Sequence, residues 1–359
     1  SNNFNNNFQN NNKTMINTNN GFYNNSAQGG DFYMAIAYLS SWRGPVPEDQ
    51  DPYNDGVTNP DAVVVKHLQE ALFLNEAPYE KIKRMIYEYG GVESSIYISI
   101  DSDQYINETY YNRYNYTYCY DGNEEPNHEI VIIGWDDQYP GYDFNTGAYS
   151  DGAFICLNSW GSDFGNNGIF YVSYDDHCIG KNAEVYSVIE DNDNYDHIYQ
   201  NDYYGWVGRM GFDSAEAYFA NVYTVPAAQV LKAVSFYATD VNTSFNVYVC
   251  RNFKNSSDLL SKRRLCAHGA FEYAGYYTVR LDEDIQLDPG ERFAVIVQIN
   301  TPDSDHPVAI EMDAGDGRTG EVITAGRESY ISDNGRIWEN TQDDSDSNIC
   351  LKAFTDDVK

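Results

Sequence analysis

The spacing of apolar residues predicts two helices in the first part of the chain. Residues 32–42 and 78–89 carry apolar side chains at the three- and four-residue intervals that place them on one helix face. Pro45 and Pro47 follow the first segment, and a pair of glycines beginning at Gly90 follows the second. Because proline and glycine disfavour further helical turns, we expect each helix to end there.

Apolar runs with the length of strands replace the helical spacing after the second helix. Residues 63–74, before that helix, are also apolar, but their pattern leaves helix and strand open. The predicted strands are residues 92–100, 128–136, 153–158, 168–174 and 184–189. This region is therefore predicted to be α+β.

From about residue 200 onward the pattern predicts strands and no helix. The apolar runs there are residues 231–238, 245–250, 276–281, 293–299, 308–312 and 349–354. Glycine, aspartate and asparagine separate them, as turn residues do. Many short strands without a helical period predict an all-β sandwich or jelly roll.

Composition divides the chain into three predicted parts. Residues 1–28 are rich in asparagine and have no apolar period, so we expect an exposed loop or processing region. Residues 29–190 form the predicted α+β domain. The acidic and Asn-rich stretch 191–196 predicts a border, which leaves residues 191–359 for the β-sandwich.

The charge of the chain excludes several classes of partner. Lys and Arg number 22 and Asp and Glu number 55, so the net charge is −33. A protein this acidic repels phosphate backbones and anionic membranes, so we expect no nucleic-acid partner. No run of about 18 apolar residues predicts a transmembrane segment, and no signal peptide is recognisable. The many tyrosines favour a secreted or cell-surface protein.

The candidate chemistry lies at the ends of two predicted strands. His128 opens the apolar run 128–136, and Asn158-Ser159-Trp160-Gly161 follows the apolar run 153–157. A pair of glycines, Gly165 and Gly168, then leads into the next strand. A histidine at a strand start is usually a solvated residue, so the later motif in the same order is what makes this position a candidate.

These motifs together resemble the papain family of cysteine peptidases. By this resemblance His128 is the general base and acid for a cysteine nucleophile, Asn158 orients the imidazole, and Trp160 shields their hydrogen bond from water. The chemistry is consistent, because a thiolate beside an imidazolium has a lowered pKa and is a nucleophile at neutral pH. The resemblance implies no metal and no cofactor.

The same resemblance implies a set of substrate-binding residues. Gly29 and Gly30 resemble the turn whose backbone hydrogen-bonds the substrate. Ser95 lies on a strand that resembles the wall of the S2 pocket, and Asn127 and Glu129 flank the histidine. If Glu129 faces S2, the pocket favours a basic or polar P2 residue; the alternative is a merely hydrogen-bonded or solvent-facing glutamate.

The nucleophile that the resemblance requires is missing from this sequence. The family places it in a Gln-Gly-x-Cys-Gly-x-Cys-Trp context before the Gly-Gly turn, and no cysteine here precedes Cys119. Cys119 lies in a loop with no helix N-terminus to lower its pKa, so we do not expect it to replace the nucleophile. We expect instead an N-terminal light chain that supplies the cysteine; the alternative is a truncated or inactive relative.

Four of the six cysteines are candidates for disulfides. Cys119 and Cys178 resemble a disulfide pair of the animal cathepsin branch, and Cys250 and Cys266 flank a predicted hairpin. The remaining two lie in apolar strands as core residues. No Cys-x-x-Cys pair occurs, so a structural zinc site is not expected.

The second half resembles a lectin-like domain that follows papain-like peptidase domains in some secreted bacterial proteins. The resemblance covers residues 190–356 and includes Gly205-Trp206, residues 231–237 and residues 289–295. Binding of a sugar does not follow from such a resemblance.

The sequence thus predicts the heavy chain of a secreted cysteine endopeptidase that acts on peptides or proteins. This chain alone would be inactive without the light chain. The competing hypothesis is an inactive papain-like relative that serves as a glycan-binding, cell-surface or assembly module.

Overall fold

The computed structural model describes residues 30–52, 59–100, 106–315, 319–320, 322–324 and 326–358. They form two compact units. The smaller unit is residues 72–187. The larger unit combines the residues before 72 with those from 188 onward.

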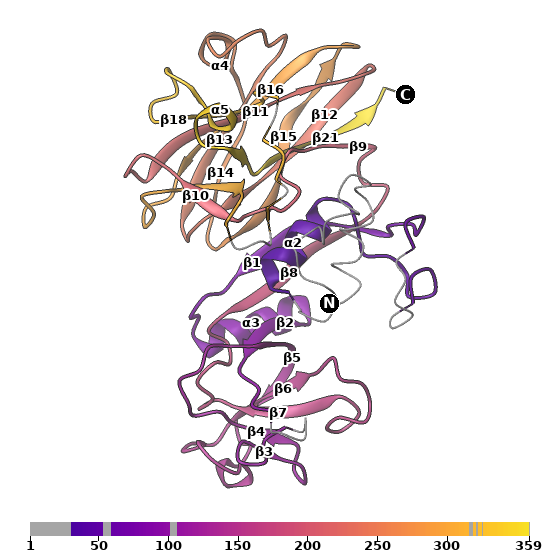
Figure 1. The fold of residues 1–359 in the computed structure, drawn as a ribbon, viewed down its shortest axis with the longest axis vertical. Helices are drawn as coiled ribbons and strands as arrows, with labels where there is room; N and C mark the ends of the chain where they lie inside the picture. Colours follow the sequence, from indigo (N-terminus) through magenta and orange to yellow (C-terminus); the bar gives the residue numbers. More distant parts are fainter. Residues whose placement is uncertain are drawn as a thin grey trace. The chain divides into compact units, whose positions relative to one another are not determined.

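The smaller unit is a twisted sheet with one amphipathic helix. Helix α3 (Tyr79–Tyr89) buries Ile82, Met85 and Ile86 and packs against strands β2 and β5. The sheet order is β3-β4-β7-β6-β5-β2-β8, antiparallel apart from the parallel pair β4–β7 (Figure 1). The strands are β2 (Val92–Ile96), β3 (Tyr111–Asn112), β4 (Thr117–Tyr118), β5 (His128–Asp136), β6 (Ala153–Leu157), β7 (Ile169–Ser173) and β8 (Ala183–Asp191), with the 3-10 turn η1 (Gly141–Asp143) after β5.

The larger unit contains the predicted first helix and the sandwich. Helix α2 (Phe32–Ser40) begins at Asp31, whose carboxylate accepts a hydrogen bond from the Met34 amide at 2.9 Å. Such a cap satisfies one of the free amides of the first turn. Met34, Ala37 and Tyr38 on this helix form a buried cluster with Tyr204.

Two sheets of the larger unit share one apolar core. One has the order β1-β15-β12-β21-β9 and the other β14-β13-β16-β11-β18-β19, while β10-β17-β20 form a third, small sheet. Alternate residues of β13, such as Phe245, Val247 and Val249, point into the core. The remaining strands follow by residue: β1 (Lys66–Phe73), β9 (His197–Tyr199), β10 (Gly208–Met210), β11 (Glu216–Thr224), β12 (Gln229–Ala238), β13 (Thr243–Cys250), β14 (Arg264–Phe271), β15 (Ala274–Leu287), β16 (Arg292–Asn300), β17 (Val308–Met312), β18 (Ser329–Ser332), β19 (Glu339–Asn340), β20 (Ser347–Ile349) and β21 (Leu351–Asp357).

The predicted elements agree with the structure in type. The α+β class, the two helices and the β-sandwich are confirmed. The ambiguous segment 63–74 is a strand, β1, over residues 66–73. The expectation of no helix after residue 200 was wrong in detail, because two single turns, α4 (Asp258–Ser261) and α5 (Thr341–Asp344), occur there.

Neither predicted disulfide is formed, because all six cysteines are free and buried. Cys250 points into a small cluster with Phe253 and Leu259, whereas Cys266 points into the main sandwich core. The two thiols therefore lie on opposite faces of one sheet, and no bond can join them without moving the backbone.

The other predicted pair lies on neighbouring segments whose side chains diverge. The His177 amide donates to the Tyr120 carbonyl at 2.9 Å, which brings the two segments together. Cys119 packs with Phe144 in an apolar cluster, while the Cys178 thiol lies 3.9 Å from a backbone carbonyl.

Within the described ranges, no helix has the length and apolarity needed to cross a membrane.

Candidate active site

Two adjacent strands bring His128 and Asn158 together. His128 is the first residue of β5, and Asn158 follows the last residue of β6, Leu157, which pairs with Val131 of β5. The antiparallel ladder therefore places the start of one strand beside the end of the other. His128 Nε2 lies 2.9 Å from Asn158 Oδ1. An amide oxygen only accepts hydrogen bonds, so Nε2 donates and Nδ1 keeps its lone pair.

The backbone after Asn158 is fixed by a tight turn. The Asn158 amide donates to the Gly168 carbonyl at 2.9 Å, which closes the loop between β6 and β7. Gly168 has φ +86°, and a Cβ on Gly165 would lie 2.3 Å from the Ile169 oxygen. Both positions therefore require glycine. The Asn158 Nδ2 is buried and has no hydrogen-bond partner among the described residues.

Trp160, predicted to shield the histidine, lies beside it. The two ring centroids are 5.0 Å apart, and Trp160 keeps 43% of its surface exposed. Phe164 meets Trp160 edge-on at 5.2 Å and the buried Phe170 at 5.3 Å. Phe164 was not among the predicted residues. Its only signal in the sequence is an aromatic side chain inside a polar loop.

The environment of His128 favours the neutral form of its imidazole. Burial lowers the pKa of His128 below its usual 6.5, and the hydrogen bond with Asn158 opposes this shift only in part. A neutral imidazole with a free Nδ1 is a competent proton acceptor.

Ser95 and Glu129 form a second polar pair one step along the same ladder. They are directly opposite in the register of β2 and β5, next to the pair Ile96 and His128. The Ser95 hydroxyl donates to Glu129 Oε1 at 2.7 Å. Consecutive residues of a strand point to opposite faces, so Glu129 and His128 diverge from β5.

A buried phenol lies among the carboxylates of this region. Tyr186 donates to Glu93 Oε2 at 2.8 Å, and its pKa is raised well above the usual value by burial and by the charges of Glu93, Glu184 and Glu129. Three carboxylates thus lie around one side chain of β8.

Asn127 is held by backbone contacts. Its Oδ1 accepts from the Ile98 amide at 2.8 Å and its Nδ2 donates to the Ile98 carbonyl at 3.1 Å. The side chain thereby extends the pairing of β2 with β5 up to the residue before His128.

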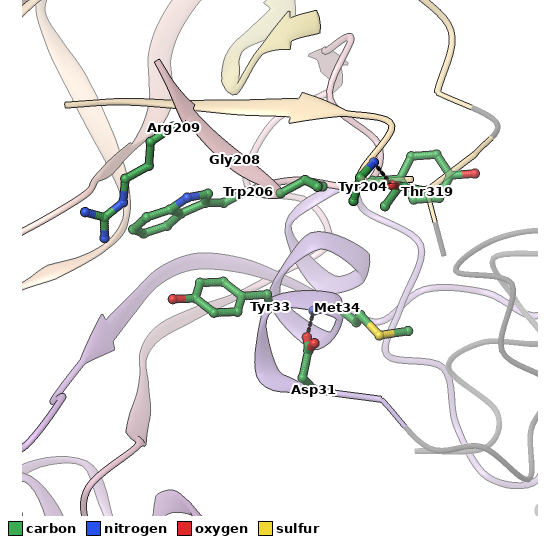
Figure 2. A pocket seen from close by; sticks show the side chains of 10 residues that line it. Asp31, Tyr33, Met34, Tyr204, Trp206, Gly208, Arg209 and Thr319 are labelled. Atoms are coloured by element: carbon green, nitrogen blue, oxygen red, sulfur yellow. Dashed lines mark hydrogen bonds between the residues drawn. The ribbon is translucent and has the colours of Figure 1, made fainter. Parts of the chain in front are cut away.

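Gly30 belongs to the larger unit, and Gly29 lies outside the described residues. Gly30 precedes the capping residue of α2, beside a pocket of about 350 Å³. Figure 2 shows the Tyr33 and Trp206 rings next to one another in the lining of this pocket, where they meet edge-on at a centroid distance of 5.4 Å. The Arg209 guanidinium lies over the Trp206 ring at 4.9 Å. Tyr33 and Arg209 were not among the predicted site residues, because no local pattern in the sequence connects them.

None of the chain's six thiols is a candidate nucleophile. All are buried, and burial raises the pKa of Cys119 to about 12. Cys156, fully buried in β6, has a pKa raised well above its usual value.

Among the described residues, one group of side chains has the spacing of metal ligands. It consists of Asp213, Asp305 and His306, all exposed, with His306 Nδ1 2.8 Å from Asp305 Oδ1. An exposed acidic group of this kind is common without an ion, and we assign no metal to it.

Comparisons with known proteins identify both parts of the chain. The model of the papain family cysteine protease matches residues 2–188, more than half of the chain, and the model of the lectin like domain matches residues 198–355. A comparison with curated protein sequences finds no match for this chain.

Two solved structures resemble the chain over nearly its whole length. One is the clostridial cysteine protease Cwp84, a cysteine-to-alanine variant after propeptide cleavage, with 26% identity, TM-score 0.79, and coverage of 92% of this chain and 83% of that one. The other contains the cysteine protease and lectin-like domains of Cwp84, a surface layer associated protein of Clostridium difficile. It has 26% identity, TM-score 0.77, and coverage of 92% and 74%. The chain therefore belongs to the papain family of cysteine proteases and carries a lectin-like domain after its protease region.

Proposed function

We propose that this chain is the heavy chain of a papain-like cysteine endopeptidase, whose nucleophilic cysteine comes from a separate N-terminal light chain. The observation that carries the proposal is the 2.9 Å contact of His128 Nε2 with Asn158 Oδ1. It fixes the tautomer that leaves Nδ1 as a base, which is the arrangement that proton transfer from a thiol requires.

In the proposed reaction His128 carries one proton through both steps. Nδ1 accepts the proton of the light-chain thiol, and the thiolate adds to the carbonyl carbon of the peptide bond. The imidazolium returns the proton to the leaving amine as the C–N bond breaks, which leaves a thioester. A water molecule then loses a proton to His128 and hydrolyses the thioester, so that the thiol is restored.

The neighbouring side chains would set orientation and exclude water. Asn158 keeps Nε2 protonated, and Trp160 lies beside the ring and covers its approach from solvent. Since Asn158 is neutral, it orients the imidazole without adding a charge to the thiolate–imidazolium pair.

We assign substrate binding to two groups of residues. The backbone of Gly29 and Gly30 would pair with the substrate, and Ser95, Asn127 and Glu129 would belong to the wall of the S2 pocket. If Glu129 lines that pocket, its carboxylate favours a basic or polar P2 residue.

The state of the thiols supports the proposed light chain. Every cysteine in this sequence is buried, with a pKa raised or a side chain enclosed in a core, so we infer that another polypeptide supplies the nucleophile. We expect the chain by itself to be inactive. Cwp84 is described as surface layer associated, which supports a secreted or cell-surface location here.

The test is the composition and activity of the natively purified protein. Intact mass spectrometry after denaturation should show this chain and a second polypeptide with a Cys-Trp segment, and the native sample should cleave peptides. A single species with the mass of this chain, together with no thiol-dependent cleavage, would refute the proposal.

That second outcome would favour an inactive relative. The same buried thiols support this alternative. The lectin-like domain would then carry the function, as a glycan-binding, cell-surface or assembly module.

A further inference from the structure

A row of neutral side chains crosses the outer face of the six-stranded sheet. The register aligns His268 of β14 with Asn246 of β13, Gln298 of β16, Tyr218 of β11 and Ser332 of β18. Their chain neighbours on these strands form the sandwich core, so by alternation this row points away from the core.

One end of this outer face is covered and the other is open. Ile296, Ala220 and Cys250 pack under the loop that contains α4, in a cluster with Phe253 and Leu259. The open end forms a pocket of about 290 Å³. Its polar lining consists of Ser244, Asn246, His268, Gln298 and Asn300.

The central amide of the pocket is oriented by its own contacts. Gln298 Nε2 donates to Glu216 Oε1 at 2.7 Å, and Gln298 Oε1 accepts from Asn246 Nδ2 at 3.1 Å and from the Tyr248 hydroxyl at 3.2 Å. These hydrogen bonds orient the Asn246 amide so that its Oδ1 remains available as an acceptor. The donors and acceptors are therefore set before any ligand arrives, which lowers the cost of binding.

The other polar side chains of the lining have donors and acceptors that no described protein group uses. Within the described ranges, the side chains of Ser244, His268 and Asn300 make no hydrogen bond, and His268 and Asn300 are exposed. Hydroxyl, imidazole and amide groups each donate and accept, which suits a ligand that carries several hydroxyl groups.

The lining is neutral in a strongly acidic protein. The chain has a net charge of −33, and exposed positions of β15 in the other sheet carry Asp282, Glu283 and Asp284. An exposed sheet face that binds no ligand would be expected to carry acidic side chains, as β15 does. The lining residues carry no formal charge, and the Glu216 carboxylate beside them is bound to the Gln298 amide, so the pocket disfavours an anionic ligand.

Aromatic side chains border the pocket. The Arg263 guanidinium lies over the Tyr218 ring at 5.4 Å and over the Tyr248 ring at 5.0 Å, and Trp338 meets Tyr218 edge-on at 6.5 Å. The Tyr248 hydroxyl, which donates to Gln298, is the polar tip that meets the lining.

We propose that this pocket binds a neutral hexose-type saccharide. Asn246, Gln298, Asn300 and His268 hydrogen-bond its hydroxyl groups, and Tyr248 and Tyr218 border it. The site is independent of the peptidase chemistry, so either proposal can fail without the other. The saccharide is part of a cell-wall polysaccharide or of a protein-linked glycan.

The test is binding of the full-length chain to a panel of neutral and anionic saccharides, with polysaccharides and glycoproteins as separate arms. We expect binding to neutral hexose units, with a dissociation constant that does not change with salt, because no ion pair forms. The arm that binds identifies the source of the saccharide.

Two variants and one control locate the site. Asn246→Ala should weaken binding about tenfold, since it removes a fixed hydrogen-bonding group. Ser244→Tyr should abolish binding by filling the pocket from its exposed rim, without removing a contact of the fold. Gln286→Ala, at an exposed amide on β15, should bind as the parent does.

Three outcomes would overturn the proposal. They are no binding to any neutral saccharide, binding that falls with salt and prefers anionic sugars, or binding that Ser244→Tyr leaves intact while the variant melts at the parent temperature.

Discussion

The His128–Asn158 pair and the helix that follows Gly30 are held in place by opposite kinds of contact. Backbone pairing of β5 with β6 sets the first, and a single side-chain hydrogen bond completes it. Side-chain packing sets the second, because α2 is buried against Tyr204 through Met34, Ala37 and Tyr38.

The two regions also differ in which part of the sequence supplies their contacts. The family match to residues 2–188 includes α2, yet α2 packs with residues beyond 188. Gly205 is one of these contacts, and a Cβ there would lie 2.8 Å from Ala37 Cβ. The chemistry is thus supported by the protease region alone, whereas the Gly30 turn is supported by the lectin-like domain.

The largest effect should come from the proton acceptor. His128→Ala in the natively purified enzyme should lower kcat about 10²- to 10⁴-fold, because no other described residue takes over proton transfer at that position. The melting temperature should change little, since His128 is half-buried and makes one side-chain hydrogen bond. Steady-state kinetics and a thermal melt measure the two effects.

A matched control is His177→Ala. This imidazole is exposed in the same unit, and its Nδ1 contacts only the Gly122 carbonyl. Equal losses of kcat in the two variants would remove His128 from the mechanism.

The orienting residue should act through the pKa of His128. Asn158→Ala removes the contact that raises this pKa, so the titration midpoint of the chain alone should fall further below 6.5, and kcat of the enzyme should fall about tenfold. Asn158→Asp should shift the midpoint upward, because a carboxylate favours the imidazolium. Proton NMR of the imidazole, assigned by its loss in His128→Gln, measures both shifts.

The lowered pKa of His128 also determines how the stability of the fold changes with pH. The folded state binds a proton at His128 less readily than the unfolded chain does. This residue therefore lowers the free energy of unfolding as the pH falls through and below 6.5. A midpoint above 6.5 in the chain alone would contradict the burial of this imidazole.

The comparison also explains what the sequence could predict. His128 and Asn158 lie at the ends of adjacent strands, so motif order was enough to bring them together. Ser95 and Glu129 were predicted as pocket residues, but their mutual hydrogen bond depends on the register of β2 with β5, which no local pattern specifies.

Two further results lay outside what local patterns determine. Cys250 and Cys266 were predicted to flank a hairpin, and they lie on the paired strands β13 and β14, but a register shift after Val247 and the alternation of side chains separate the thiols. The packing of α2 with Tyr204 joins residues far apart in the sequence, and apolar spacing shows only that a helix has a buried face.

Disruption of the α2 contact should affect stability and substrate binding more than kcat. Gly205 has φ +64°, and Gly205→Leu would add strain there as well as a clash with Ala37. We expect a loss of about 1–3 kcal/mol in the free energy of unfolding and a raised KM. Gly290→Leu is the control, because Gly290 has φ +73° with nothing within 4 Å of an added Cβ. If both variants lose the same stability and keep the same KM, the contact with α2 has no role in substrate binding.

The smallest effect should come from a swap that preserves volume in the packed region. Met34→Leu should cost less than about 1.5 kcal/mol and leave KM within about twofold, because cores tolerate apolar residues of equal size. The comparable swap in the polar pair, Asn158→Leu, keeps the number and branching of the side-chain heavy atoms but leaves Nε2 of His128 without its acceptor. Denaturant unfolding and steady-state kinetics of the two variants measure the contrast. If Met34→Leu reduces kcat as much as Asn158→Leu does, the helix after Gly30 and the catalytic pair depend on the same kind of contact.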